Sequence, residues 1–387
     1  MNQHERFLAV CRGEKPDYVP IFGFLEAPGM SGGVMRVAYD NLLRTGMPDI
    51  GGVWELDGRP RNLEGWLDYW GTAIPMDIDF FPGTRGGWPK SQKTVRDGFE
   101  YIEYETGALT RQVLNNDVTY SMPDYMSFHV RDRASFERYK AIRTPSLPWT
   151  KQQIDGACAA YDRREKPLRV QVCSTFGNLR DMMGPEMACT VFYDDPELAE
   201  DIFAWLRWEN RTFWFPLIER LKPDIVMTSE DMCYNHGMFI SPKLFEQYCA
   251  PAYREIGEVV RAAGVPVFAV DTDGFAEPVL PLLTACGVNA LFPWEVKSQN
   301  DLYRVRENYP ELILLGGLEK ECANEGNEGN IRAEIEAKRA LIAGGRYFPN
   351  GDHGIQPLAT FENLCKFMTL LHEVTGNPEG KFPRVNP

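Results

Sequence analysis

The sequence lacks long apolar runs, paired cysteines and a surplus of basic residues. No apolar stretch approaches the roughly 18 residues that a membrane helix needs. The opening MNQHERFLAVCRGEKPD is charged and amphipathic, unlike a secretory signal. The nine cysteines are scattered without a CxxC pair, which favours free thiols in a reducing compartment. These absences predict a cytoplasmic protein with neither disulfide bonds nor a membrane anchor.

Several motifs for common chemistries are also missing. The chain has no GxGxxG after a strand, no GxxxxGK[ST], no HExxH and no GxSxG. Nucleotide binding by a standard loop and serine-hydrolase chemistry are therefore disfavoured. The formal net charge is −14, so the long-range field repels phosphate groups. We expect no nucleic-acid or membrane partner.

What the sequence does contain is a regular alternation of strand-like and helix-like segments. We expect strands over 167–175, 223–231, 266–274, 289–296, 312–320 and 346–354, with others at 18–24 and around 49–56. Helices are expected over 194–221, 241–264, 277–287, 298–310, 331–345 and 360–376. Repeated strand–helix units predict a parallel sheet, and about eight of them predict a (β/α)8 TIM barrel formed by a single domain over 1–387.

Local signals support several helix boundaries. Asp195 is suited to cap the helix that Pro196 begins, and Gly264 is suited to end the helix that opens at Ser241. Pro251 is expected to kink or divide that second helix.

Residues 85–145 interrupt the alternation. Alternating polarity and turn glycines at Gly98 and Gly107 predict antiparallel hairpins near residues 85–125. We interpret 85–145 as an insertion that forms a lid or an edge over the barrel mouth.

Polar side chains gather where the predicted strands end. In a parallel barrel these ends share one face, where functional groups collect. Asp271 and Asp273 are two residues apart, so in extended backbone they face the same side. His353 ends another strand. The candidate catalytic residues are Asp271, His353 and Glu230, and the candidate substrate-binding residues are Phe24, Glu26, Asn178, Asp231, His236, Trp294 and Asn350.

These polar groups admit more than one reading. Two neighbouring carboxylates repel, so either one is protonated or a cation lies between them. Asp271, Asp273 and His353 are thus candidate ligands of a divalent metal. Alternatively, the DxDG stretch only shapes a turn, and His353 only satisfies backbone groups in GDHG. Glu230 and Asp231 contact substrate or are held by arginines.

The order of several motifs resembles the uroporphyrinogen decarboxylase superfamily. The matching stretches are ERFLAVCRGEKPDYVPIF, SEDMCYNHGMFISPKLFEQYCAPAYREI, VDTDG and NGDHGIQPLATFEN. The resemblance spans nearly the whole chain and implies a (β/α)8 barrel. The superfamily includes tetrapyrrole decarboxylases and methyltransferases that work with corrinoid proteins.

The resemblance is closer to the methyltransferase branch. The decarboxylases carry an arginine-rich stretch after the first strand, whereas FGFLEAPGMSGG here contains Glu26 and no arginine. SMPDYMSFHVRDRASFERYK resembles the methyltransferases. Some of them hold zinc with a His-x-Cys pair at the position of Asp271 and Asp273, completed by a later cysteine near Asp352 and His353. Oxygen ligands here argue against a thiol acceptor.

The resemblance therefore implies a methyltransferase that moves a methyl group from a small donor to a corrinoid protein. The donor is a methoxylated compound, such as an aromatic methyl ether that undergoes O-demethylation, or a methylamine-like compound. The expected cofactors are a corrinoid carried by the partner protein and a zinc or other divalent metal ion. A homodimer is left open. The alternative enzyme is a decarboxylase of a carboxylated substrate, and a binding barrel without catalysis is the third hypothesis.

Overall fold

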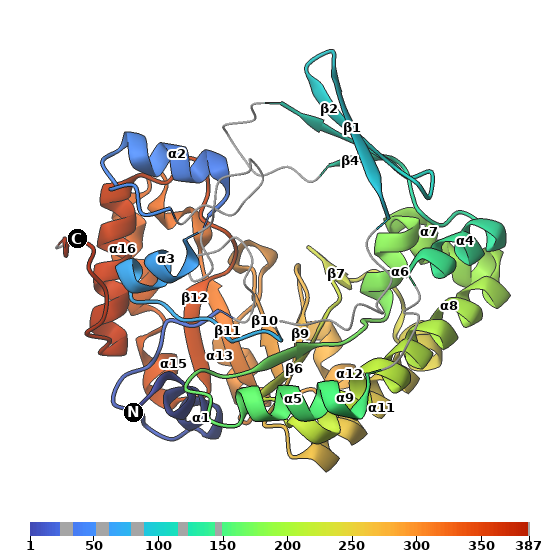
Figure 1. Cartoon of the computed structure of the whole chain (residues 1–387). Coiled ribbons are helices and arrows are strands. Elements are labelled where there is room, and N and C mark those ends of the chain that lie inside the picture. The colour runs from blue at the N-terminus through green and yellow to red at the C-terminus, as the bar shows by residue number, and fades with distance from the viewer. Residues whose placement is uncertain (24–33, 52–61, 79–88, 115–122, 144–148, 386–387) are drawn as a thin grey trace.

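The computed structural model describes residues 1–23, 34–51, 62–78, 89–114, 123–143 and 149–385. A parallel sheet of six strands lies at its centre, in the order β12-β11-β10-β9-β6-β5 (Figure 1). These strands are β5 (Arg169–Gln171), β6 (Ile225–Ser229), β9 (Val267–Asp271), β10 (Ala290–Phe292), β11 (Ile313–Leu318) and β12 (Tyr347–Gly351). Each begins within two residues of its predicted start, and all six end earlier than predicted.

Two shorter segments continue the sheet around a common lumen. Met76 forms a parallel bridge with Leu168 beside β5, and Ala73 forms another with Phe22. Phe22 in turn lies next to β12, where its carbonyl accepts a 3.4 Å hydrogen bond from Asn350 Nδ2. The predicted (β/α)8 architecture is confirmed. The prediction of a strand around 49–56 is wrong for residues 49–51, the described part of that range, because they do not form a strand. Instead, the segment 73–76 provides the neighbour of Phe22.

Helices connect the strands and surround the sheet (Figure 1). Those with a full turn or more are α1 (Gln3–Arg12), α2 (Arg36–Arg44), α3 (Leu63–Trp70), α4 (Arg133–Arg143), α5 (Lys151–Tyr161), α6 (Phe176–Met183), α7 (Pro185–Asp194), α8 (Pro196–Glu209), α9 (Phe215–Leu221), α11 (Ala250–Ala263), α12 (Leu280–Ala285), α13 (Leu302–Asn308), α14 (Ile331–Glu336), α15 (Arg339–Gly344) and α16 (Phe361–Thr375). A three-residue helix, α10 (Pro242–Leu244), precedes α11.

The predicted helix signals act as expected. The Asp195 side chain accepts the Leu198 amide at 3.0 Å and caps α8. Gly264 ends α11 in the left-handed conformation, with φ of 72°. A π-helical turn over Phe245–Cys249 separates α10 from α11 shortly before Pro251, so the predicted helix is divided there.

Aromatic rings fill the lower part of the lumen. Phe7 of α1 lies 5.1 Å from Phe22 and 5.4 Å from Phe348, measured between ring centroids. Met227 and Ala269 belong to the same buried cluster. Because side chains alternate along a strand, the residues two positions further on point to the same face. The polar side chains that end β6 and β9 therefore stand above this apolar floor.

The interrupting segment forms a separate antiparallel sheet. Its strands are β1 (Ser91–Arg96), β2 (Phe99–Tyr104), β3 (Leu109–Val113) and β4 (Asp124–Ser127), paired in that order. The turn glycines Gly98 and Gly107 have φ of 80° and 86°, as the hairpin prediction requires. In Figure 1 the sheet stands on the same side of the barrel as β7 (Cys233–Tyr234), which follows β6. That this antiparallel sheet acts as a lid stays a prediction.

Two further sequence predictions concern disulfides and membrane helices. All nine cysteines are free thiols, as expected from their scattered positions. Within the part of the chain that the structure describes, no helix combines the length and apolarity that a bilayer-spanning segment requires.

Candidate active site at the carboxyl ends of the strands

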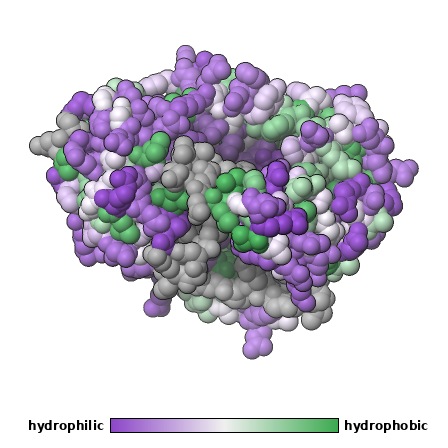
Figure 2. Space-filling view, turned by 90° about the horizontal axis from the view of Figure 1, so that it is seen from above, coloured by the Kyte–Doolittle hydropathy of each residue, from purple (hydrophilic) through white to green (hydrophobic). Residues whose placement is uncertain are grey.

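The predicted strand ends meet at one edge of the barrel. Ser229 and Asp271 are register partners at the ends of β6 and β9, and Phe292 of β10 pairs with Asp271 on its other side. The chain then leaves the sheet, so Asp273 lies just beyond β9. The face seen from above is hollowed, and the recess shows hydrophilic residues, with both hydrophilic and hydrophobic residues along its rim (Figure 2).

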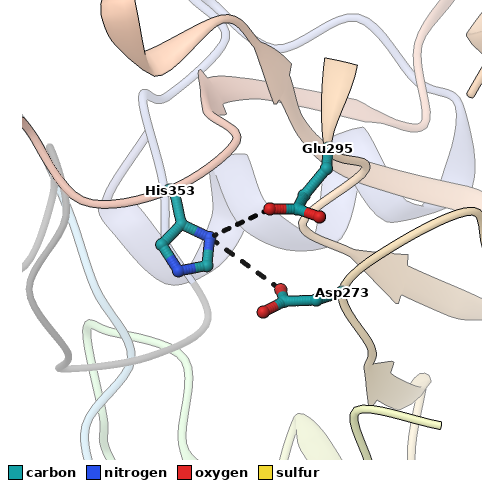
Figure 3. A group of neighbouring side chains, drawn as sticks. All are labelled: Asp273, Glu295 and His353. Carbon is teal, nitrogen blue, oxygen red and sulfur yellow. Dashed lines mark ion pairs between the residues drawn. The ribbon is translucent and has the colours of Figure 1, made fainter. Parts of the chain in front are cut away.

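Three side chains from separate segments converge in this region (Figure 3). Asp273, Glu295 and His353 each offer one ligand atom, and these atoms lie within 4.8 Å of one another. His353 Nδ1 is 3.8 Å from Asp273 Oδ1 and 3.9 Å from Glu295 Oε1. The Asp273 and His353 side chains are 37% and 41% exposed, so a small molecule can reach them. Of the predicted set, the structure therefore brings Asp273 and His353 together, with Glu295 as their partner.

Glu295 is held in place as a carboxylate. Its Oε2 accepts the Gly274 amide at 2.9 Å and the Ser298 hydroxyl at 3.1 Å, and Lys320 Nζ lies 3.5 Å from Oε1. Burial on its own raises the pKa of Glu295, but these donors and charges lower it overall. Glu295 is therefore a fixed negative charge beside His353.

Asp273 has the opposite tendency. Burial and the repulsion of Asp231 and Glu295 raise its pKa to about 7, although Lys320 and Arg180 act in the other direction. At neutral pH this carboxyl group can therefore hold or release a proton. That property is the one that a general acid needs.

Asp271 belongs to a second, overlapping group. Asp231, Asp271 and Asp273 also place ligand atoms within 4.8 Å of one another. Burial, followed by repulsion from Asp231 and Asp273, raises the pKa of Asp271 well above its usual range. Arg180 Nη2 donates to Asp231 Oδ2 at 2.6 Å and neutralises one charge. Asp273 is shared by both groups, whereas Asp271 and His353 fall in different ones.

Asp352 is a buried residue that supports the loops of the site. It is 2% exposed, and its carboxyl oxygens accept the Val296 amide at 2.8 Å and the Lys320 amide at 3.0 Å. These bonds tie together the loops that carry Glu295, Lys320 and His353. Burial raises the pKa of Asp352 to about 6.

Glu230 occupies a different setting from the other predicted acids. It is 1% exposed, and its oxygens accept hydrogen bonds from the Thr175 amide and hydroxyl, the Gly177 amide and the Tyr253 hydroxyl, at 2.7–2.8 Å. Protein donors thus surround the carboxyl group that was predicted to act on substrate. This placement indicates that Glu230 anchors the start of α6. It does not support the predicted catalytic role of Glu230.

The remaining predicted residues divide into accessible and buried positions. His236 is exposed in the hairpin of β7 and β8 (Gly237–Met238), with its ring 5.8 Å from that of Tyr234. Asn178 is half-buried and accepts the Ser174 hydroxyl at 3.0 Å. Asn350 is buried and bonded to the neighbouring segment.

Trp294 is a core residue in the structure. Trp294 is 1% exposed and its indole donates to the Leu291 carbonyl at 2.6 Å, so it packs in the core and its predicted role as a donor-site wall has no support. Phe24 and Glu26 lie outside the described residues.

Sequence reasoning did not select Glu295 and Lys320 as site residues. Glu295 follows the strand end at Phe292, so its position carried the same signal as Asp273. Lys320 follows β11 in the same way. What the sequence does not reveal is that the Glu295 side chain turns toward His353 and that Lys320 pairs with Glu295.

Gly274 lets the site and the β7–β8 hairpin come together, and its substitution tests this contact. Gly274 has φ of 78°, and a Cβ there would lie 2.7 Å from the backbone of Tyr234. We expect Gly274→Ala to lower the free energy of unfolding by about 3 kcal/mol, from strain and steric overlap. Gly98→Ala is the matched control, since its φ is 80° but nothing lies within 4 Å, and it should cost about 1 kcal/mol. Equal losses in urea unfolding would contradict the close approach.

The donor atoms of the site suit a divalent cation. Asp273 and Glu295 offer oxygens and His353 offers a nitrogen, a combination that zinc and harder divalent ions accept. Three protein ligands leave room for substrate or water. The proximity of like charges, reflected in the raised pKa of Asp273, is relieved equally by a bound cation or by a proton.

Comparisons with known proteins agree with this architecture. A family model described as uroporphyrinogen decarboxylase (URO-D) matches residues 116–374, well over half of the chain. The solved structure of a methyltransferase from Methanosarcina mazei aligns over 97% of this chain and 98% of its own, with a TM-score of 0.56 and 12% identity.

A second solved structure is a putative vitamin-B12 independent methionine synthase from Listeria monocytogenes. It aligns over 62% of this chain and 73% of its own, with a TM-score of 0.34 and 15% identity. No curated protein sequence matches. The match of the family model over this span, on a barrel whose strand ends meet in one site, shows that the chain belongs to the uroporphyrinogen decarboxylase (URO-D) family.

Proposed function

We propose that this protein is a methyltransferase that moves a methyl group from a small methoxylated or methylamine-like donor to a corrinoid carried by a partner protein. The observation that carries the proposal is the cluster of Asp273, Glu295 and His353, in which Asp273 has a pKa of about 7. A group of this kind can stabilise an oxygen that leaves with negative charge.

The charge of the site favours this reaction over decarboxylation of a polyanion. Asp231, Asp271, Asp273 and Glu295 lie close together, and the nearby cations Arg180 and Lys320 are each paired with one of these acids. A substrate with several carboxylates would be repelled here and would find its candidate counterions already engaged.

For a methyl ether, the transfer balances as follows. The C–O bond breaks with its electron pair going to oxygen, and the methyl carbon bonds to the reduced cobalt of the partner's corrinoid. Asp273 donates a proton to the leaving oxygen, and the fixed carboxylate of Glu295 keeps His353 oriented. For a methylated ammonium donor, the nitrogen leaves with the electron pair and needs no proton.

A divalent metal is compatible with the same residues. Asp273, Glu295 and His353 would hold it, and it would supply Lewis-acid stabilisation of the leaving oxygen. Because the metal must displace the Asp273 proton, its affinity should rise about tenfold per pH unit below pH 7.

Methyl transfer to free cobalamin tests the proposal. The purified protein, assayed for bound metal, is mixed with chemically reduced cobalamin and either 2-methoxyphenol or trimethylamine. We expect methylcobalamin to form from at least one donor, and its absorption spectrum measures this formation. The demethylated product should appear in equal amount.

The contrary result is equally definite. No methylcobalamin from a panel of methoxy and methylamine donors, together with release of carbon dioxide from a carboxylated one, would favour the decarboxylase alternative. Heat-inactivated protein controls for transfer without the enzyme.

A further inference from the structure

A second cavity adjoins the carboxylate cluster. Its volume is about 380 Å³, within the range of small-ligand sites, and its lining runs from the end of β5 to α6 and α8. Ser229 belongs to this lining and is also hydrogen-bonded to Asp271. Gln171 Nε2 donates to the Ser229 hydroxyl at 3.2 Å. Ser229 and Asp271 therefore link the cavity to Asp273, which shares an acidic group with Asp271.

Three aromatic side chains form walls of this cavity. Tyr139 and Trp205 lie with ring centroids 6.2 Å apart at an interplanar angle of 82°, and Trp214 is a further lining residue. Rings set edge to face in this way offer flat apolar surface to a third ring.

The charges around the cavity nearly balance. Arg169 is engaged by Asp77 through two hydrogen bonds, of 2.7 and 2.5 Å. The other charged lining residues are Arg143, Asp181 and Glu209, two acids and one base. The surplus negative charge of the lining would repel an anionic ligand. The same surplus is too small to compensate for the free energy that a cationic ligand loses when it leaves water.

Neutral hydrogen-bonding groups complete the lining. Gln171, Ser174 and Asn178 provide amide and hydroxyl groups. Such groups recognise phenolic hydroxyl and ether oxygens without requiring a charge on the ligand.

From these features we propose that the cavity binds the ring of an uncharged methoxylated arene, with the methoxy group at the Ser229 side. This inference rests on the proposed methyltransferase function and specifies its donor: a methoxylated phenol, and not a methoxylated benzoate or an ammonium compound.

Three ligands of similar shape and different charge test it. The probes are 4-methoxyphenol, 4-methoxybenzoate and 4-methoxybenzylamine, which at pH 7.5 are neutral, anionic and cationic. Binding to the full-length protein is measured by calorimetry and by tryptophan fluorescence. We expect 4-methoxyphenol to bind at least tenfold more tightly than either ion. Tighter binding of either ion, or no binding of any probe, would overturn the proposal.

Paired variants locate the binding. Trp205→Leu should weaken 4-methoxyphenol binding about tenfold, whereas Trp208→Leu on the same helix, 41% exposed and outside the lining, should not. Gln171→Ala should weaken it threefold or more, with Gln152→Ala, exposed on α5, as its control. Because Gln171 is exposed, its variant tests the cavity even if Trp205→Leu fails to fold.

The two proposals fail differently. Binding that follows these variants without methyl transfer would overturn the proposed function and leave the cavity assignment standing. If the protein transfers the methyl group of 4-methoxyphenol, but Gln171→Ala binds this compound as tightly as the wild type does, only the cavity assignment would be overturned.

Discussion

Replacing Asp273 by asparagine should lower the rate of methyl transfer by about 10²–10⁴-fold, the range expected for loss of a general acid. The amide keeps the shape of the side chain but cannot donate a carboxylic proton. Initial rates of methylcobalamin formation measure the loss. The limb of the wild-type pH–rate profile that falls near pH 7, where Asp273 gives up its proton, should vanish in the variant.

The same substitution should affect stability in a defined direction. The pKa of Asp273 is raised to about 7 from an ordinary value of 3.8, so the folded protein binds the extra proton between these values. Stability is therefore lost as pH rises through about 4 to 7. The wild-type protein should lose free energy of unfolding between pH 5 and 8. Since the Asp273 side chain is 37% exposed, we expect Asp273→Asn to reduce this loss by only about 1 kcal/mol. Asp162→Asn, exposed at the end of α5, should alter neither rate nor this slope. An unchanged rate in the Asp273 variant would remove this residue from the reaction.

The second large effect concerns folding. Glu230→Gln should lower the free energy of unfolding by about 3 kcal/mol, because the amide nitrogen would face a backbone or hydroxyl donor. All four of its donors, from Thr175, Gly177 and Tyr253, are inside the protein. Urea unfolding followed by circular dichroism measures the change.

A matched glutamate separates burial from chemistry. Glu258→Gln on the exposed face of α11 should change stability by less than about 0.5 kcal/mol. If Glu230→Gln were as stable as this control but inactive, the carboxyl group would be acting on substrate and not as an anchor.

The barrel was predictable because its signals are local. Each strand carries apolar residues between turn signals, and caps such as Asp195 and Gly264 mark helix ends wherever they occur. The segment at 73–76 was missed because it pairs through isolated bridges and carries little strand-like pattern.

The site was only partly predictable. The strand-end rule located Asp271, Asp273 and His353 on one edge, but it gives no direction for a side chain. Glu230 and Asp231 are adjacent in sequence, yet one is enclosed by protein donors while the other pairs with Arg180. Asp231 also has a positive φ of 43°, a backbone conformation that the sequence does not predict.

The arrangement of Asp273, Glu295 and His353 on separate loops has a consequence for how such proteins diversify. Because every one of these positions follows its own strand, a point mutation at any of them alters the chemistry while the strands that carry the other two stay in place. Descendants of one barrel can therefore exchange a carboxylate for a thiolate or an imidazole stepwise, and so drift between hard and soft ions while the scaffold is inherited intact.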